Sequence, residues 1–267
     1  MTKAKKIKDI IKLAKQMRKV LLEVSLNCGE PTHIGGGLSI VDIMATLYGD
    51  ILNLDLKKPK DRFILSKGHG FLGLLSALHC TGYIPKNELM KFQTNGSELI
   101  AHPIINPKFG IESSNGSLGQ GLSFGIGIAI AYKKLNKNNS IYVLVGDGES
   151  YEGSVWEAAI SATESNLDNL ILIVDSNGYQ NDGAINEKMN SQELELKWKG
   201  FGWNTLACNG HNITNLLESL KTRAVNKPTA IIAHTTKGKG VSFMENNNDW
   251  HHGRLTQKLF EEAIKGL

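Results

Sequence analysis

The sequence predicts an α/β protein in which a mainly parallel sheet carries helices on both faces. Three runs of residues, at 141–145, 170–174 and 229–235, are largely apolar and rich in β-branched side chains. Such runs are expected of strands that are buried on both sides, as they are in parallel sheets. A helical pattern separates the first two runs, and strands that alternate with helices build a parallel sheet.

The N-terminal segment is predicted to be an amphipathic helix. Between Ile7 and Val24, apolar residues recur at spacings of i, i+3, i+4 and i+7, which places them on one face. The first twenty residues carry seven lysines and one arginine against a single acidic residue. A basic N-terminus could bind nucleic acid or a membrane surface, or direct import, but the apolar stripe favours a helix that packs on the core with its lysines in solvent.

The elements that follow lead up to the first long apolar run. After a glycine-rich stretch at 28–38, an apolar helical pattern covers 40–52, a short strand is predicted at 62–66 and a helix at 71–80. Pro85, Pro103 and Pro107 interrupt the stretch 81–116, which is predicted to be mostly irregular. A glycine-rich turn at 116–121 then leads into a helix of small side chains that extends to residue 132.

The two central strands each end in a turn that carries oxygen ligands. Asp147 follows the strand at 141–145 and precedes a helix at 154–165, while Asn177 follows the strand at 170–174. A right-handed βαβ unit would place these turns side by side. A carboxylate and an amide oxygen suit Mg²⁺ or Ca²⁺, and the glycines that flank Asp147 would let a phosphate approach the backbone. Alternatively, the glycines form a simple turn and Asn177 caps the strand.

Composition excludes several classes of protein. With 267 residues, 41% hydrophobic and 21% charged, and a formal net charge of +4, the chain is predicted to be globular, with one domain over residues 1–267. No apolar stretch approaches the ~20 residues that span a bilayer. We therefore expect neither a membrane nor a nucleic acid as partner. Cys28, Cys80 and Cys208 are widely spaced, without Cys-x-x-Cys, which favours a reducing compartment and a cytoplasmic location.

Several motifs together resemble the diphosphate-binding half of transketolase, a family of thiamine-diphosphate-dependent enzymes. The segment from Gly146-Asp-Gly to Asn177 resembles the thiamine-diphosphate motif, which opens with Gly-Asp-Gly and closes with Asn about thirty residues later. Further matching segments follow the family's order, at 33–39, 61–69, 101–103, 115–121 and 250–253. The resemblance extends from about Ala14 to the C-terminus, and it implies the thiamine-diphosphate-binding fold, in a domain of the PP type.

The resemblance implies a role for each matching residue. Asp147 and Asn177 would ligate the divalent ion, Mg²⁺ or Ca²⁺, with the backbone carbonyl of Tyr179 as a third ligand. The residues implied in binding thiamine diphosphate are His69, Gly116, Ser117, Leu118, Gly148, Glu152, Asn177 and His252. The catalytic set that would handle the sugar comprises His33, His69, His102 and His252. Ser117 stands where many relatives have proline, a conservative difference at a position that acts through its backbone.

The family resemblance also implies an activity and a partner. The chain resembles the N-terminal subunit of a split transketolase, which moves a two-carbon ketol unit from a ketose phosphate to an aldose phosphate, in pentose phosphate metabolism or in a dedicated biosynthetic route. The family's activating glutamate lies on a second domain, for which no room follows Lys258. We therefore expect the chain to be inactive alone and to work with a separate C-terminal subunit in a heterotetramer.

Other functional classes stay open at this point. The Gly-Asp-Gly…Asn motif also occurs in E1-type subunits of 2-oxoacid dehydrogenases and in deoxyxylulose phosphate synthases, although His33 and the segment 66–69 favour sugar handling. A non-catalytic module that binds thiamine diphosphate would have no need of His33 or His102. A dinucleotide-binding domain is disfavoured, because residues 116–121 have Gly-x-x-Gly-x-Gly and follow no buried strand.

A few residues allow two interpretations. Glu152 and Glu157 could favour the positive end of a helix dipole, or they could belong, as in the family, to a carboxylate chain at a subunit interface. His251 cannot be separated from its neighbour in the motif. The histidines interpreted as structural are His79, His211 and His234.

Overall fold

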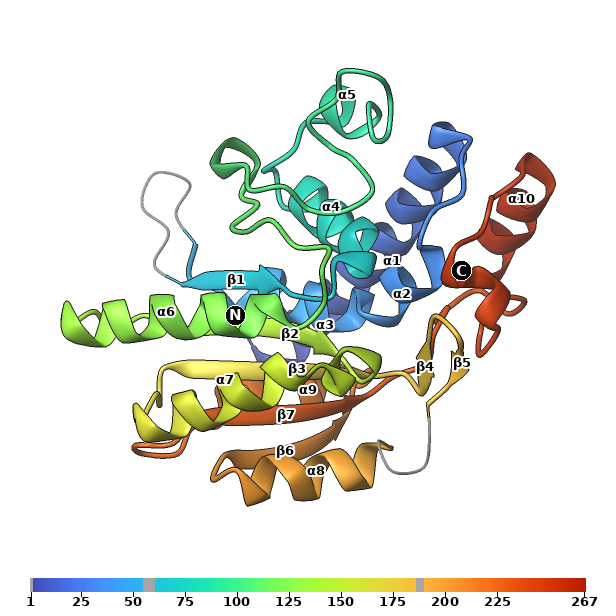
Figure 1. Cartoon of the computed structure of the whole chain (residues 1–267). Helices are drawn as coiled ribbons and strands as arrows, with labels where there is room; N and C mark the ends of the chain where they lie inside the picture. Colours follow the sequence, from blue (N-terminus) through green and yellow to red (C-terminus); the bar gives the residue numbers. More distant parts are fainter. Residues whose placement is uncertain (1, 55–60, 186–189) are drawn as a thin grey trace.

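The computed structural model of the chain describes residues 2–54, 61–185 and 190–267. Its centre is a five-stranded sheet in the spatial order β1-β2-β3-β7-β6 (Figure 1). The strands are β1 (Arg62–Leu65), β2 (Ile141–Gly146), β3 (Leu170–Ser176), β7 (Thr229–His234) and β6 (Asn204–Asn209). Every pairing between neighbours in this sheet is parallel. The predicted α/β class and the three predicted long strands are confirmed.

Helices cover both faces of the sheet (Figure 1). One side carries α1 (Lys3–Cys28), α2 (Ile34–Ser39), α3 (Val41–Thr46), α4 (Phe71–Cys80), α9 (Ile213–Lys221) and α10 (Gln257–Gly266). The other side carries α6 (Gln120–Lys134), α7 (Gly153–Glu164) and α8 (Ser191–Gly200). Tyr142 and Leu144 belong to the first apolar core, whereas Val143 and Val145 belong to the second. Because both sides of β2 are buried, its side chains show no polar alternation.

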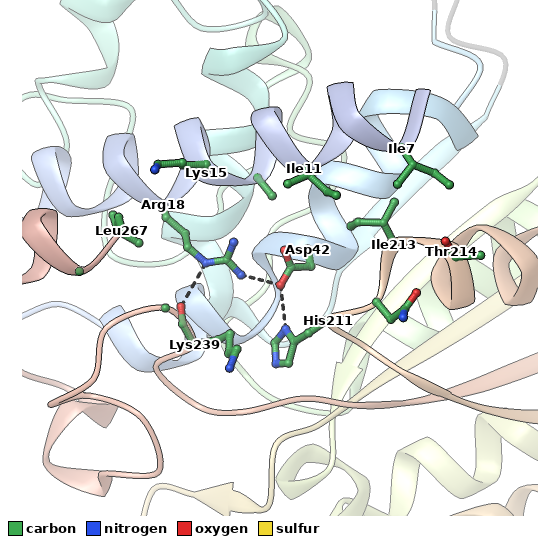
Figure 2. Close-up of a pocket in the computed structure, with 14 residues that line it drawn as sticks. Ile7, Ile11, Lys15, Arg18, Asp42, His211, Ile213, Thr214, Lys239 and Leu267 are labelled. Atoms are coloured by element: carbon green, nitrogen blue, oxygen red, sulfur yellow. Dashed lines mark hydrogen bonds and ion pairs between the residues drawn. The ribbon is translucent and has the colours of Figure 1, made fainter. Parts of the chain in front are cut away.

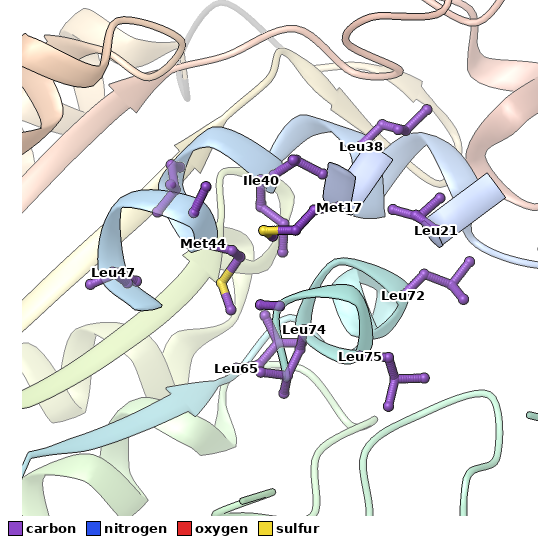
Figure 3. Close-up of a cluster of buried hydrophobic side chains, with 14 of the residues drawn as sticks. Met17, Leu21, Leu38, Ile40, Met44, Leu47, Leu65, Leu72, Leu74 and Leu75 are labelled. Carbon is purple, nitrogen blue, oxygen red and sulfur yellow. The ribbon is translucent and has the colours of Figure 1, made fainter. Parts of the chain in front are cut away.

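The first core is closely packed where α1, α3 and α4 meet (Figure 3). Met17 and Leu21 from α1, Met44 from α3 and Leu75 from α4 are fully buried there. The N-terminal segment therefore lays an apolar stripe on the core, as the sequence predicts. Ile11 departs from that prediction, because 53% of its surface is exposed.

The glycine-rich stretch at 28–38, for which the sequence predicts no helix, contains α2. A Cβ atom on Gly73 of α4 would lie 2.8 Å from the carbonyl oxygen of Gly37 in α2, and a Cβ atom on Gly37 would lie 3.3 Å from the amide nitrogen of Gly73. Glycine by itself is a poor helix former. Close approach of two helix backbones, rather than local propensity, therefore explains both the glycines and the helix.

Three elements between the second and third apolar runs, namely α8, β6 and α9, are absent from the sequence prediction. β6 lies at the edge of the sheet and pairs only with β7. Within β6 only Cys208 is buried. An edge strand with so little covered surface shows neither a continuous apolar run nor a clear alternation of apolar and polar residues. The sequence of β6 therefore lacks the apolar run by which the central strands are predicted.

The remaining short elements lie mostly around the carboxyl ends of the strands. They are a π-helix (Leu47–Ile51), α5 (Lys86–Leu89), 3₁₀ turns at Gly68–Gly70, Pro107–Phe109, Gly148–Tyr151 and Asn248–His251, and the hairpin of β4 (Tyr179–Gln180) and β5 (Gly183–Ala184). The parallel strands end beside this hairpin (Figure 1). Ligands of α/β sheets bind at this edge.

Two findings bear on the environment of the protein. Cys28, Cys80 and Cys208 are all free thiols. Among the described segments, no helix combines the length and the apolar character that crossing a bilayer requires.

Candidate active site

A cavity of about 450 Å³ opens at the carboxyl edge of the sheet. The residues that follow four of the strands line it, with Lys67 after β1, Asp147 after β2, Asn177 after β3 and Lys237 after β7. Among the residues implied by the family resemblance, those that line the cavity are His69, Leu118, Asp147, Gly148, Glu152, Asn177 and Tyr179. Asp147 and Asn177 come together because β2 and β3 pair in parallel, with Gly146 opposite Asp175.

Asp147 is a buried carboxylate in this cavity, with 2% of its surface exposed. It accepts hydrogen bonds from the backbone amides of Gly148 (2.8 Å) and Gly178 (2.7 Å). Burial, together with the charge of Asp175, raises the pKa of Asp147 to about 7. Within the described ranges no lysine, arginine or histidine forms an ion pair with it. A divalent cation would supply the missing positive charge.

The donor atoms beside Asp147 fit such a cation. The amide oxygen of Asn177 accepts the backbone N–H of Tyr179 (3.1 Å), which fixes the turn, and its amide nitrogen donates to Asp175 (2.8 Å). Carboxylate, amide and carbonyl oxygens are the ligands that Mg²⁺ and Ca²⁺ prefer. The predicted oxygen ligands and Tyr179 therefore border one cavity, and their chemistry suits a hard ion.

Two lysines place positive charge in the same cavity. Lys67 forms an ion pair with Asp175, which is completely buried, and also donates to the carbonyl of Gly36 (3.3 Å). Lys237 is 2% exposed and donates to Asn248 (2.7 Å). Burial, and then the charge of Lys67, lower the pKa of Lys237 to about 8. Ammonium groups beside a cation site suit a diphosphate, which carries several negative charges.

Glu149, the residue after the Gly-Asp-Gly turn, lines the cavity and connects three of its segments through hydrogen bonds. Its carboxylate accepts hydrogen bonds from the hydroxyl of Ser66 (2.5 Å) and from the backbone amides of Gly119 (2.8 Å) and Gly146 (3.1 Å). Gly119 has a left-handed conformation with φ of 81°. One buried side chain thus joins the ends of β1 and β2 to the turn at 116–121, of which Leu118 lines the cavity.

A cluster of histidines lies next to the cavity. The ring centroid of His33 is 4.7 Å from that of His69, 5.4 Å from that of His102 and 4.6 Å from that of His252. Burial, followed by repulsion from the neighbouring rings, lowers the pKa of His33 to about 3. The same causes lower the pKa of His69 to about 4. At neutral pH these rings are therefore uncharged.

His251 also belongs to this cluster. Its ring centroid lies 5.6 Å from that of His33, and its Nδ1 is 2.9 Å from the ammonium nitrogen of Lys237. Burial, and then the charge of Lys237, lower the pKa of His251 to about 4. His251 lines the cavity, whereas His252 is exposed and touches the cluster through His33. The sequence places His252 in the site and leaves His251 open; in the structure both rings lie beside His33, and of the two it is His251 that lines the cavity.

A partly buried network of Arg18, Asp42 and His211 lines a second pocket and contacts the loop that follows β7 (Figure 2). Asp42 accepts hydrogen bonds from Arg18 (2.5 Å) and from Nδ1 of His211 (2.8 Å). The other ring nitrogen of His211 accepts the backbone N–H of Thr236 (2.8 Å), next to Lys237. His211, interpreted from the sequence as structural, thus supports a segment of the site without lining the cavity.

Sequence reasoning assigned no role to Lys67, Lys237 or Asp175. A signal was available, because each follows or ends a predicted apolar run at the carboxyl edge of a parallel sheet. Glu152 lines the mouth of the cavity, and Glu157 is exposed on α7. Neither carboxylate forms a hydrogen bond or ion pair with the described residues, so both interpretations of them remain predictions.

The fold and the cavity together define a class of protein. A parallel sheet whose carboxyl edge presents oxygen ligands, buried ammonium groups and clustered histidines is suited to an anionic cofactor that is held through a hard divalent cation. Residues 11–265 match the family described as "Transketolase, thiamine diphosphate binding domain". The chain therefore belongs to the transketolase family.

Curated relatives and solved structures agree with this family. The chain is 40% identical over 254 residues to a subunit of apulose-4-phosphate transketolase from Phocaeicola vulgatus, covering 93% of this chain and 90% of the relative. It is 38% identical over 265 residues to the 6-deoxy-6-sulfo-D-fructose transketolase subunit SqwG of a Clostridium species, covering 97% and 96%. Transketolase from Leishmania mexicana has a similar structure, with a TM-score of 0.87 and 27% identity; the alignment covers 95% of this chain but 40% of the Leishmania chain.

Proposed function

We propose that this chain is the N-terminal, diphosphate-binding subunit of a two-subunit transketolase. The observation that carries the proposal is the cavity in which Asp147 and Asn177 lie beside two buried lysines and a cluster of neutral histidines. Relatives of nearly the same length are named as transketolase subunits. The three free thiols support a cytoplasmic location. One continuous sheet shared by both cores supports a single domain over residues 1–267.

The chain's own residues would bind and orient thiamine diphosphate through its anionic end. Asp147, Asn177 and the carbonyl of Tyr179 would hold Mg²⁺ or Ca²⁺, and the cation would bind the diphosphate. Lys237 and the peptide groups around Gly148 and Leu118 line the same cavity and would contact it directly. When bound, the cofactor supplies the stabilised carbanion that ketol transfer requires. The protein's contribution is orientation and electrostatic stabilisation.

The histidine cluster would handle the hydroxyl groups of the sugar. His33, His69 and His102 come from three separate segments yet present their rings to one another at the side of the cavity. Because their pKa values are lowered, the rings are neutral and can accept a hydroxyl proton. This arrangement supports sugar chemistry over 2-oxoacid chemistry, which has no hydroxyl proton of this kind to move.

A partner subunit would complete the site. The Leishmania transketolase is more than twice as long as this chain, which spans 40% of it. Tyr151 lines the cavity and is 45% exposed, and the adjacent helices α6 and α7 expose Phe124 and Ile160. A partner that covers this side of the cavity would bury these side chains, and contiguous apolar surface of that kind marks interaction sites. We infer a C-terminal subunit in a heterotetramer.

We expect the purified chain alone to show no ketol transfer, and the chain with its partner to be active. The partner is first identified by its stoichiometric recovery with the tagged chain from the native cell. Activity is then measured with xylulose 5-phosphate, apulose 4-phosphate and 6-deoxy-6-sulfo-D-fructose as ketoses, and with pyruvate as the 2-oxoacid control. Full turnover by the chain alone, or turnover of pyruvate only, would contradict the proposed function.

His33→Ala should depress turnover of the assembled enzyme by about 10²–10⁴-fold, the usual contribution of a positioned acid or base. Cofactor affinity should stay near that of the wild type, because His33 does not line the cavity that holds the oxygen ligands and lysines. The matched control is His234→Ala, an exposed histidine at the end of β7. An unchanged rate in His33→Ala would assign this histidine a structural role instead.

A further inference from the structure

Three of the clustered histidines are arranged as a set of metal ligands. One ring nitrogen from each of His33, His69 and His102 lies within 4.8 Å of the other two. Zinc–imidazole bonds are about 2.0–2.1 Å long, so nitrogens that share a tetrahedral zinc ion lie about 3.3 Å apart. The three side chains are half-buried, and binding of one ion would require rotations that bring their nitrogens to that spacing.

Among the described residues, none forms a polar contact with these ring nitrogens. In the parts of the chain that the structure describes, no hydrogen bond or ion pair involves a ring nitrogen of His33, His69 or His102. By contrast, the rings of His79 and His211 are each engaged, with the carbonyl of Ile84 and with Asp42. Metal binding requires neutral imidazole, and burial lowers the pKa values of the three clustered histidines, so their lone pairs are available at pH 7.

We propose that His33, His69 and His102 bind one divalent transition-metal ion of the Zn²⁺ class. Imidazole nitrogen favours Zn²⁺, Cu²⁺ and Ni²⁺, whereas the oxygen donors of Asp147 and Asn177 favour Mg²⁺ and Ca²⁺. The two neighbouring sites therefore select different ions. A fourth position would be filled by water or by the exposed His252, whose ring centroid is 4.6 Å from that of His33.

The expected affinity is moderate. Histidines of tight zinc sites are usually held by a carboxylate or carbonyl on the second ring nitrogen, and loss of that support costs about 10–100-fold in affinity. None of the described residues supports the rings of His33, His69 or His102 in this way. We therefore expect reversible binding in the micromolar range rather than a permanent structural ion.

Binding of such an ion would regulate the enzyme, a consequence that rests on the function proposed above. An ion held by the three histidines would occupy the positions that the sugar hydroxyls need. Inhibition would be competitive with the ketose and would be reversed by a chelator. The binding itself does not depend on the proposed function, and it can be measured without substrate, cofactor or partner.

The test uses the untagged full-length chain in buffer with excess Mg²⁺. Titration with Zn²⁺ alone should give one site per chain, and Co²⁺ should give the visible absorption of a nitrogen-ligated ion that Zn²⁺ displaces. His33→Gln and His102→Gln should each weaken Zn²⁺ binding by at least ~10-fold. His234→Gln controls for an ordinary exposed histidine, and Asp147→Asn controls for the oxygen site. Both should bind Zn²⁺ like the wild type.

Zn²⁺ binding that persists in both histidine variants, or that disappears in Asp147→Asn, would overturn the proposal. X-ray absorption at the zinc edge of the loaded wild-type chain gives a second measurement that does not depend on how the variants fold. Three or more imidazole nitrogens at about 2.0 Å support the site, and fewer than three overturn it. If zinc binds in this way but does not inhibit the assembled enzyme, the metal site stands and the proposed role of the histidines in sugar handling fails.

Discussion

Asp147→Asn is expected to abolish Mg²⁺-dependent binding of thiamine diphosphate, with a loss of at least about 100-fold in affinity. Asparagine keeps the size of the side chain but removes the buried negative charge that would attract the cation. Because the pKa of Asp147 is raised to about 7, the cation must also displace a proton at low pH. Cofactor affinity of the wild type should therefore fall as the pH is lowered below about 7.

Calorimetric titration of thiamine diphosphate at a fixed Mg²⁺ concentration, at pH 6 and pH 8, measures both effects. Asp182→Asn is the matched control, because Asp182 lines the same cavity but is exposed on the β4–β5 turn.

Folding of Asp147→Asn should be preserved. Folding raises the pKa of this carboxyl above its value in the unfolded chain. Such a group destabilises the folded state increasingly as the pH rises from the unfolded-state pKa to the folded-state pKa of about 7. Its replacement relieves that cost, which offsets the loss of one backbone hydrogen bond. Unchanged cofactor affinity would refute the ligand assignment.

Lys67→Met should destabilise the chain by about 3–5 kcal/mol, because it leaves a completely buried carboxylate without its cation. Burial alone would raise the pKa of Asp175. The charge of Lys67 and the hydrogen bonds from Lys67, Thr235 and Ser39 instead hold it below its ordinary value. Without Lys67 the pKa of Asp175 should rise above its unfolded value. The stability deficit should then be greatest near pH 7 and shrink towards pH 4.

Urea unfolding of Lys67→Met and of the double variant Lys67→Met/Asp175→Asn measures this coupling. The amide oxygen at position 175 can still accept hydrogen bonds from Ser39 and Asn177, and its amide nitrogen can donate to the hydroxyl of Thr235. The double variant should therefore recover more than half of the lost stability. Lys91→Met, which removes an exposed pair with Glu88, should cost less than about 1 kcal/mol. A deficit for Lys67→Met that is equally large at pH 4 and pH 7 would contradict this account of Asp175.

The metal-ligand pair could be predicted from the sequence, whereas the burial and ion pairing of the lysines could not. Asp147 and Asn177 each follow an uninterrupted apolar strand, and the rule that consecutive parallel strands lie side by side then brings them together. Lys67 also follows a predicted strand. However, an exposed lysine and a buried one look alike in sequence, and only the packing of Asp175 beneath it shows that its charge is needed.

The histidine cluster depends on segments whose positions no local pattern determines. His33 precedes a helix built on glycine backbone contacts, His102 lies in a largely irregular stretch, and His251 and His252 come from the C-terminal part of the chain. The family resemblance groups His33, His69, His102 and His252. The contact between His251 and Lys237 follows only from the fold, since it joins the 3₁₀ turn at Asn248–His251 to the loop after β7.

By itself, the sequence determined the α/β class, the central strands, the amphipathic α1 and the spacing of the oxygen ligands. These features depend on residue periodicity and on strand topology, which are local or follow general rules. Only the tertiary structure decided that α2 is a helix, that β6 closes one edge of the sheet, and that the pKa values of Asp147 and Lys237 are shifted. Those properties arise from close backbone contacts, from burial and from neighbouring charges, all of which require residues far apart in the chain to meet.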